Sequence, residues 1–429
     1  MLGWPLWTAY LVQRYVSGKS RPGWLQRWGR LPDSITARAS SRPRIWVHAV
    51  SAGEVVAAVP IVREVRALLP GYDILISVIT PAGMAMAEQQ AAPHVDGLFF
   101  FPIDLPWVAK RVVEQVQPRV FISLESELWP NVLHELHRQG ATAIMANGRI
   151  TDRSFQRVRR FGSGLFRWML SNMDRMLVQS DADASRIVRL GGDPGRVQVV
   201  GNSKFDQEIA ELTAEDVAHM RAALKLPAQG PVFIAGSTRS AEEEACIIKA
   251  YLAMRASHQD LCLIIAPRHV ARAAELAGAM TRAGLQPVRK TEVGAASIAR
   301  HVILDTMGEL ADTYAVASFA FVGNTFPPTV NGGGQNLLQP LAHGKPVAFG
   351  PETATIRSEV ALATGAGVGF QVGSSEQLAD WGIGLLENEA ERERIGSRAR
   401  ALVLSQRGVS RRYADIIAEV ALAAAGSGR

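Results

Sequence analysis

Short apolar runs alternate with amphipathic helical patterns along almost the whole chain, and this alternation constrains the fold more than any other feature. In the first half, stretches such as 61–69, which Pro70-Gly71 terminates, have the periodicity of helices. Between them lie seven predicted strands: Ile45–Val50, Asp73–Ile79, Leu98–Phe101, Val120–Leu124, Thr142–Met145, Met176–Val178 and Val197–Val200. The alternation predicts an α/β fold with a mostly parallel sheet.

The same alternation restarts after a polar helical stretch at 208–226 and the turn Pro227-Ala-Gln-Gly-Pro231. Residues 377–425 have a helical pattern. Six more strands are predicted: Val232–Ala235, Leu261–Ala266, His301–Asp305, Phe319–Val322, Val347–Phe349 and Val368–Val372. Because 429 residues exceed one ordinary core, we predict two Rossmann-like domains, 31–207 and 208–429, that face an interdomain cleft.

Composition narrows the class of partner without choosing one. With 48% hydrophobic and 20% charged residues the chain is globular. The formal net charge of +6 suits a nucleotide, an anionic lipid surface or nucleic acid. Cys246 and Cys262 lie in apolar runs without a Cys-x-x-Cys motif, which predicts buried thiols in a reducing compartment and no structural zinc.

The N-terminal segment 1–30 combines a short apolar run with basic and aromatic residues. The run at 2–16 is too short to span a bilayer, and the absence of a small-residue cleavage site argues against a signal peptide. The following residues alternate in character: Lys19, Arg21, Trp24, Arg27, Trp28 and Arg30. This pattern predicts a helix at the membrane interface; a terminal helix packed on its own domain is the alternative.

One carboxylate follows the first strand. The strand Ile45–Val50 runs into a tight turn, and Glu54 comes directly after it. Ligands of open α/β sheets bind beyond the carboxyl ends of the strands, where a carboxylate can take a proton. Ser51-x-x-Glu54 is equally a capping box, so both interpretations stay open. Pro60 should begin or kink the next helix, which would leave Glu54 on a short turn before it.

Two further motifs follow strands of the first half. Glu125 and Glu127 come after the fourth strand and should approach the same edge, with Trp129-Pro130 as an apolar wall; a solvated loop is the alternative. Asn147-Gly-Arg149 follows the fifth strand, and arginine binds phosphate through two hydrogen bonds. The arginines that follow, Arg157, Arg159, Arg160 and Arg167, are typical of a solvent-exposed basic helix.

In the second half, phosphate-binding residue types follow the strands. Pro267-Arg-His269 can meet a phosphate or a base, and Asp305–Leu310 repeats the strand–turn–helix theme, although Thr306-x-x-Glu309 is again a possible capping box. The glycines at 332–334 allow close approach of a ligand, and exposed N–H groups there suit phosphate. The motif matches neither a Walker loop nor a dinucleotide fingerprint, and a structural glycine turn is the alternative.

No catalytic triad or metal-ligand motif stands out, which favours metal-free transfer chemistry. Together the motifs resemble the 3-deoxy-D-manno-octulosonic acid (Kdo) transferase family over nearly the whole chain. The resemblance rests on Trp46-Val-His-Ala-Val-Ser-Ala-Gly-Glu54, Thr80-Pro-Ala-Gly83, Glu125-Ser-Glu-Leu-Trp-Pro-Asn131, Asn147-Gly-Arg149, Gly201-Asn-Ser-Lys-Phe-Asp206, Pro267-Arg-His269 and Asp305-Thr-Met-Gly-Glu-Leu310.

The resemblance implies a GT-B fold whose last helix crosses back to the first domain. It also implies an inverting, metal-independent enzyme without a cofactor, which transfers Kdo from CMP-Kdo to the lipid A precursor. The family's members are monotopic proteins on the cytoplasmic face of the inner membrane, with no nucleic-acid partner. By motif, Glu54 is expected to be the general base, and the acceptor-side residues are Ser51, Gly53, Glu125, Glu127, Asn147 and Arg149. The expected CMP-binding residues are Lys204, Pro267, Arg268, His269, Met307, Gly308, Glu309, Gly333, Gly334, Asn336 and Gln339.

The chain departs from the family pattern at two places. Gln339 stands where the family usually has Glu, and Thr355-Ile356 replaces an Asn-Phe pair. Gln retains a carbonyl acceptor for a ribose hydroxyl but carries no charge. A GT-B sugar-nucleotide epimerase, a transferase with another donor and an inactive membrane-surface paralogue are therefore the alternative functions.

Overall fold

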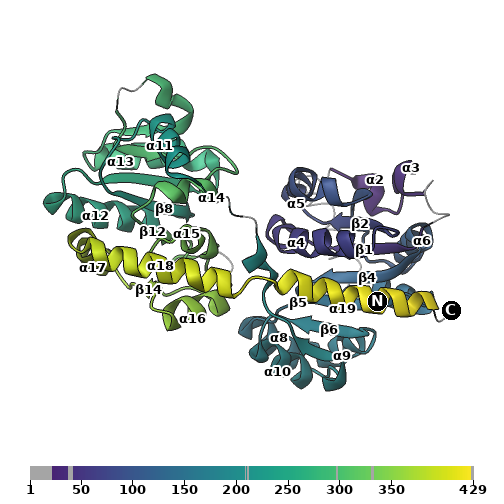
Figure 1. Cartoon of the computed structure of the whole chain (residues 1–429). Coiled ribbons are helices and arrows are strands. Elements are labelled where there is room, and N and C mark those ends of the chain that lie inside the picture. Colours follow the sequence, from purple (N-terminus) through teal and green to yellow (C-terminus); the bar gives the residue numbers. More distant parts are fainter. Residues whose placement is uncertain are drawn as a thin grey trace. The chain divides into compact units, whose positions relative to one another are not determined.

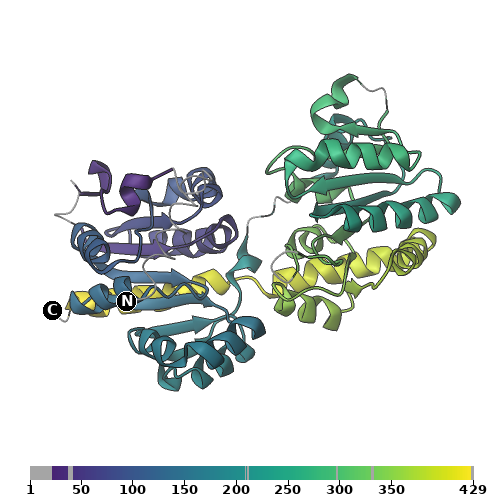
Figure 2. The same cartoon turned by 180° about the vertical axis from the view of Figure 1, so that it is seen from behind.

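The computed structural model describes residues 22–36, 42–207, 209, 212–295, 298–329 and 333–426. It contains two compact α/β units (Figures 1 and 2). Unit 1 comprises residues 1–207 and 407–429, and unit 2 comprises 208–406. The second domain was predicted as 208–429 with a final helix that crosses back to the first domain, and the segment from Arg407 onward is part of unit 1.

Unit 1 is built on a seven-stranded parallel sheet with the order β3-β2-β1-β4-β5-β6-β7. Its strands are β1 (Arg44–His48), β2 (Asp73–Val78), β3 (Gly97–Phe100), β4 (Pro118–Leu124), β5 (Thr142–Gly148), β6 (Arg175–Val178) and β7 (Val197–Val199). All seven predicted strands are confirmed. Both faces of β1 are buried, since Ile45 and Val47 enter one hydrophobic cluster and Trp46 enters the other.

Helices cover both faces of this sheet. They are α2 (Trp24–Arg27), α3 (Asp33–Thr36), α4 (Ala52–Leu68), α5 (Pro81–Met86), α6 (Pro106–Val116), α7 (Pro130–Arg138), α8 (Asp152–Phe161), α9 (Ser163–Ser171), α10 (Asp181–Arg189) and α19 (Val409–Gly426). One cluster joins residues of α4 and α19 to the sheet, and the other joins residues of α6 and α7 to it.

The prediction that Pro60 begins the helix after β1, with Glu54 on a turn before it, is wrong. Helix α4 begins at Ala52 and contains Pro60, so Glu54 lies in its first turn. An interior proline costs a helix about 3 kcal/mol, but Pro60 and the apolar residues around it, including Val55, Ile61 and Val65, are buried. Burial of each large aliphatic side chain contributes about 1.5–3 kcal/mol, which is enough to offset the proline.

Helix α19 returns the end of the chain to unit 1 (Figure 1, yellow). Tyr413 and Ile417 are buried in the cluster that contains α4 and the sheet residues. The Tyr413 hydroxyl donates a hydrogen bond to the Gly201 carbonyl at 2.9 Å, and Gly408 N donates to Asp206 Oδ1 at 2.6 Å. The unit 1 core is therefore built from both ends of the sequence.

Unit 2 repeats the architecture with the parallel order β10-β11-β9-β8-β12-β13-β14. Its strands are β8 (Val232–Thr238), β9 (Cys262–Pro267), β10 (Pro287–Arg289), β11 (His301–Ile303), β12 (Phe319–Val322), β13 (Val347–Phe349) and β14 (Gly369–Gln371). The six predicted strands are confirmed, and β10 was missed. This edge strand has three residues, begins with proline and is only half-buried, so it lacks the apolar pattern of a central strand.

The helices of unit 2 are α11 (Ala214–Ala223), α12 (Ala241–Ser257), α13 (Ala273–Arg282), α14 (Leu310–Thr313), α15 (Leu338–Ala342), α16 (Arg357–Gly365), α17 (Ser375–Glu387) and α18 (Glu389–Ser405). The predicted helical region 377–425 thus consists of α17, α18 and α19. Asn388 caps α18 through its side chain, and Gly408 has a φ of 83° before α19.

The predicted N-terminal segment 1–30 lies outside the described residues up to position 21. From position 22 onward it packs on unit 1: Arg27 is 5% exposed, lies 4.6 Å from the centroid of the Phe100 ring and donates a hydrogen bond to the Ile79 carbonyl. For residues 22–30 the alternative of a terminal segment packed on its own domain is therefore observed. In the described part of the chain, every helix is too short or too polar to cross a bilayer.

Candidate active site

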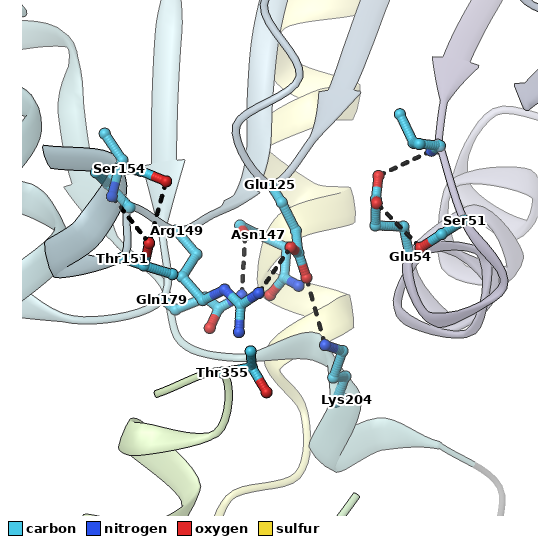
Figure 3. Close-up of polar contacts among 12 residues, drawn as sticks. Ser51, Glu54, Glu125, Asn147, Arg149, Thr151, Ser154, Gln179, Lys204 and Thr355 are labelled. Carbon is cyan, nitrogen blue, oxygen red and sulfur yellow. Dashed lines mark hydrogen bonds and ion pairs between the residues drawn. The ribbon is translucent and has the colours of Figure 1, made fainter. Parts of the chain in front are cut away.

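Three carboxylates lie at the carboxyl edge of the unit 1 sheet and interact electrostatically; Figure 3 shows two of them, Glu54 and Glu125. Glu54 follows β1, and Glu125 and Glu127 follow β4, which pairs directly with β1. Their negative charges act on one another, since Glu125 and Glu127 both raise the pKa of Glu54. The sequence prediction that these two motifs approach the same edge is thus consistent with the geometry.

Glu54 is held at the start of α4. Its Oε2 accepts a hydrogen bond from Val50 N at 2.8 Å, and its Oε1 accepts one from the Ser51 hydroxyl at 3.1 Å. Ser51 occupies the N-cap position, but its side chain caps no backbone N–H. The reciprocal capping box is therefore not formed, although Glu54 does satisfy a backbone donor one residue before the cap. Gly53 lies exposed in the same turn.

The surroundings hold Glu54 in its protonated form at neutral pH. Burial, with the charges of Glu125 and Glu127, raises the pKa of Glu54 to about 8, although its two hydrogen bonds favour ionisation. Burial and the charge of Glu125 also raise the pKa of Glu127, to about 7. A carboxyl group with a pKa near the working pH can accept a proton and release it again.

Glu125 differs because two cations neutralise it. Lys204 Nζ lies 3.3 Å from its Oε1, and Arg149 Nη2 lies 3.2 Å from its Oε2 (Figure 3). Burial opposes ionisation, but Lys204 and Arg149 outweigh it and lower the pKa of Glu125. Its backbone φ of 55° is unusual for a residue with a side chain, and the two ion pairs offset that strain. Lys204, predicted as a donor-side residue, thus contacts the acidic group of unit 1.

Asn147 is a support of this edge. It is fully buried with a φ of 53°. Its Oδ1 accepts a hydrogen bond from Ser203 N at 3.1 Å, and its carbonyl accepts one from Gln179 Nε2 at 3.0 Å. Asn147 therefore holds the segment that carries Lys204 against β5. Because its side chain is fully buried, the structure does not support the predicted direct contact between Asn147 and the acceptor.

The carboxyl edge of the unit 2 sheet is cationic. Arg268 and His269 follow β9 at Pro267 and are exposed, while Arg239 follows the neighbouring strand β8. Arg239 Nη2 lies 3.5 Å from His269 Nε2. Partial desolvation and the charges of Arg239, Arg268 and Arg272 lower the pKa of His269, which keeps its ring neutral at pH 7. Such a group can bind phosphate oxygens.

The turn after β11 is ordered by local contacts. Asp305 accepts hydrogen bonds from Thr291 N at 3.0 Å and from the Thr291 hydroxyl at 2.6 Å. Glu309 accepts from Lys290 and from Thr306, which lower its pKa against the effect of burial. Glu309 itself precedes α14, so the predicted capping box is wrong. Met307 is 69% exposed, and Gly308 has a φ of 88°.

The glycine-rich motif is shaped by its own packing. Gly333 and Gly334 have φ values of 81° and 103°, and a β-carbon on either would lie within 2.1–2.5 Å of Glu352 or Ile356. The structural interpretation of these glycines therefore accounts for them without a ligand. Asn336 Oδ1 accepts a hydrogen bond from Leu338 N at 2.9 Å. Gln339 is half-buried in α15.

Arg239 is the residue that the sequence analysis missed. The predicted strand ended at Ala235, whereas β8 continues to Thr238 and Arg239 is therefore the first residue beyond it. The signal was the basic residue at the end of Gly236-Ser-Thr-Arg239. Among the described residues, no group of three His, Cys, Asp or Glu side chains is arranged to hold a metal ion.

Comparison with known proteins identifies the family. Residues 22–207 match the family model described as "3-Deoxy-D-manno-octulosonic-acid transferase (kdotransferase)". A 3-deoxy-D-manno-octulosonic acid transferase of Bordetella pertussis is 31% identical over 401 residues, which cover 91% of this chain and 90% of the relative. A Haemophilus influenzae transferase of the same name is 30% identical over 377 residues, 87% and 86% of the two chains. The chain belongs to the 3-deoxy-D-manno-octulosonic acid transferase family. It is a glycosyltransferase, as the resemblance implied.

Solved structures support the fold alone. A UDP-GlcNAc 2-epimerase of Neisseria meningitidis has a TM-score of 0.63 at 12% identity and covers 88% of this chain and 99% of its own. Anabaena Alr3699/HepE in complex with UDP and glucose has a TM-score of 0.59 at 16% identity, with coverages of 87% and 98%. The predicted GT-B architecture is confirmed as a GT-B-like pair of parallel α/β units.

Proposed function

We propose that this family member transfers Kdo from CMP-Kdo to the lipid A precursor, with Glu54 as general base. The observation that carries the proposal is the carboxyl group of Glu54, held beside Glu125 and Glu127 with its pKa raised to about 8. A sugar hydroxyl is a weak nucleophile, and a base whose pKa is near the working pH removes its proton most effectively.

The proposed reaction is a single displacement. The acceptor hydroxyl oxygen attacks the anomeric carbon of Kdo while its proton passes to the ionised Glu54. The bond from that carbon to the phosphate oxygen breaks, and CMP leaves with the bonding electrons. Attack on the face opposite the leaving group inverts the anomeric configuration. Glu54 then returns its proton to solvent, which restores the ionised base for the next turnover.

Unit 2 supplies the donor side of this proposal. Arg239 and Arg268 carry positive charge at the carboxyl edge of β8 and β9. Charge-assisted hydrogen bonds from guanidinium groups to the CMP phosphate would stabilise the charge that develops as CMP departs. His269, whose pKa is lowered by partial desolvation and by its three arginine neighbours, retains a lone pair and an N–H for the nucleotide.

The test is an incubation of the full chain with CMP-Kdo and the lipid A precursor, followed by mass spectrometry. The expected product has gained the mass of one or more Kdo residues. Matched incubations with UDP- and GDP-sugars should leave the acceptor unchanged. Transfer from a UDP-sugar, or no change of the acceptor with CMP-Kdo, would overturn the proposed function.

We also propose that unit 1 lies on the cytoplasmic face of the inner membrane, as its acceptor requires. Helices α8 and α9 expose Leu165 at 56% and Trp168 at 39%. Exposed basic side chains flank them: Arg153, Arg157, Arg159, Arg160 and Arg167. The exposed apolar and aromatic side chains can enter the interface of a bilayer, while the arginines beside them bind anionic lipid headgroups.

Sedimentation with vesicles that contain anionic lipid tests this location. Leu165→Glu should weaken binding, because it places a negative charge among the apolar contacts. The control is Leu404→Glu in unit 2, where the parent side chain is 47% exposed. Equal binding of both variants and the parent would contradict the proposed surface.

A further inference from the structure

One carboxylate of unit 2 is buried at the carboxyl edge that carries Arg239 and Arg268. Glu243 lies in the first turn of α12 and is only 1% exposed. Ser240 caps this helix, and its hydroxyl accepts a hydrogen bond from Glu243 N at 3.1 Å, which fixes the backbone of Glu243. Because a buried carboxylate is costly unless hydrogen bonds compensate it, the partners of Glu243 show what it holds together.

Four backbone N–H groups donate to the two oxygens of Glu243. Its Oε2 accepts hydrogen bonds from Arg239 N at 3.1 Å and from Asn324 N at 2.9 Å. Its Oε1 accepts from Thr325 N at 2.9 Å and from Phe326 N at 3.2 Å. Because β8 and β12 pair directly, Glu243 connects the loops that follow these two strands.

The loop after β12 has the geometry of an anion-binding nest. Three consecutive N–H groups, those of residues 324–326, donate to one carboxylate, and Asn324 has a φ of 57°. The anion in this nest is the side chain of Glu243 itself. These N–H groups are therefore occupied within the chain, and they hold the loop in one conformation rather than bind a donor phosphate.

The same loop holds two further segments of this edge. The Asn324 carbonyl accepts a hydrogen bond from Gly334 N at 2.6 Å, which ties the glycine-rich motif to the loop. The Thr325 hydroxyl accepts a hydrogen bond from Gly350 N at 2.8 Å, which attaches the loop after β13. Glu243 thus connects four segments, directly or through one residue: the loops after β8, β12 and β13, and the glycine-rich motif.

Glu243 acts on the side chain of Arg239 as well as on its backbone. Burial and the charge of Arg268 lower the pKa of the Arg239 guanidinium, and the negative charge of Glu243 opposes them. Glu243 therefore favours the cationic form of Arg239 and at the same time holds its N–H group in place. Both effects serve a guanidinium that is expected to bind phosphate.

We propose that Glu243 is a positioning residue of the donor side, which assembles the carboxyl edge of unit 2 and holds Arg239 where it binds the CMP phosphate. The effect on CMP rests on the proposed function, whereas the four hydrogen bonds do not depend on it. Glu243 itself does not touch the donor in this proposal, because backbone N–H groups use both of its oxygens.

Glu243→Gln tests the proposal, because it keeps the size of the side chain but replaces one acceptor oxygen by an NH2 donor. Backbone N–H groups then face a donor, the edge loses its arrangement, and CMP should bind about tenfold more weakly in isothermal titration calorimetry. The matched control is Glu244→Gln, at the next position of α12. Glu244 is 2% exposed, but it accepts hydrogen bonds from the Thr238 hydroxyl and from Arg272 Nη2, so this variant should bind CMP as the parent does.

Nuclear magnetic resonance of the backbone amides separates positioning from a general loss of stability. In the parent chain, the amides of residues 324–326 should exchange with solvent as slowly as those of β12. In Glu243→Gln the amide signals of Arg239, residues 324–326, Gly334 and Gly350 should move, whereas Glu244→Gln should leave them in place. These results are expected even if the chain binds no CMP.

Either of two results would overturn the proposal. One is fast exchange of the amides 324–326 in the parent chain, a measurement that needs no variant. The other is a folded Glu243→Gln chain that binds CMP as tightly as the parent does. A parent chain that binds no CMP would instead overturn the proposed function, and the amide signals would then decide whether Glu243 assembles this edge.

Discussion

The two sheets of this chain are both parallel and seven-stranded, but they have opposite charge at their carboxyl edges. In each unit the first strand lies inside the sheet, beside the second strand on one side and a later strand on the other. Glu54 follows the first strand of unit 1, and Arg239 follows the first strand of unit 2. The fold therefore places the functional residues of both units at the carboxyl edge of the sheet. The identity of the first residues after each strand determines which chemistry that edge can perform.

The largest expected effect comes from removing the carboxylate of unit 1. Glu54→Gln should lower turnover about 10²–10⁴-fold, the usual contribution of a general base, while CMP binding to unit 2 stays unchanged. Rate measurements with CMP-Kdo and calorimetry with CMP check the two statements. Glu88→Gln, which removes an exposed carboxylate of the same unit, is the control and should keep the parent rate. Turnover by Glu54→Gln within threefold of the parent would sink the base assignment.

Removing a cationic side chain from unit 2 should mainly weaken the binding of CMP. Arg239→Ala should weaken CMP binding by about 10–100-fold, because one charge-assisted hydrogen bond to phosphate contributes about 1.5–3 kcal/mol. Isothermal calorimetry gives the Kd. Arg282→Ala, at the exposed end of α13, removes the same charge away from this edge and should bind CMP as the parent does. Equal Kd values for both variants would mean that the charge of the edge is irrelevant.

The acidic edge of unit 1 is expected to depend on its own cations for stability. Lys204→Met should lower the free energy of unfolding by about 1–3 kcal/mol at neutral pH, because Glu125 loses a partner while buried. The ion pairs lower the pKa of Glu125 below its ordinary 4.5. The stabilisation is therefore present above pH 4.5 and is lost as the pH falls through the lowered value.

Urea denaturation at neutral and acid pH measures this difference. The deficit of Lys204→Met should be full at neutral pH and should shrink in acid. Lys110→Met removes a surface lysine 3.9 Å from Glu114 and should cost less than about 0.5 kcal/mol. A deficit that grows in acid would contradict the assigned ion pair.

The smallest effect is a shift of the pH profile. If Glu54 must be ionised, log kcat should rise with pH through about 8. Glu127→Gln removes a negative charge beside Glu54, so the pKa of Glu54 falls and the rise should move to lower pH. Steady-state rates measured between pH 6 and pH 9 would show this displacement of the profile. Its size should match the pKa shift that one nearby charge produces. An unmoved profile would mean that Glu54 and Glu127 do not interact.

Most of the fold was predictable because buried parallel strands have a strong apolar signal. Only β10, short and half-buried, escaped it. The acidic residues were found because they follow such strands. The partner of Lys204 could not be found, since it depends on how the segment after β7 packs against Asn147. Arg239 was missed because the last residues of β8 are polar, so the apolar run that predicted the strand ended before them. The predicted helix start at Pro60 was wrong because burial of the helix in the core outweighs the free-energy cost of an interior proline.

Helix α19 has a consequence for how the chain is made. Its buried Tyr413, Ile417 and Ala421 complete the hydrophobic cluster of unit 1, yet they are synthesised after all of unit 2. A nascent chain on the ribosome therefore holds the face of α4 and the sheet uncovered while nearly two hundred intervening residues, 208–406, are translated. Unit 2 can complete its core first, although unit 1 begins the sequence, and the apolar face of unit 1 stays uncovered until α19 is made.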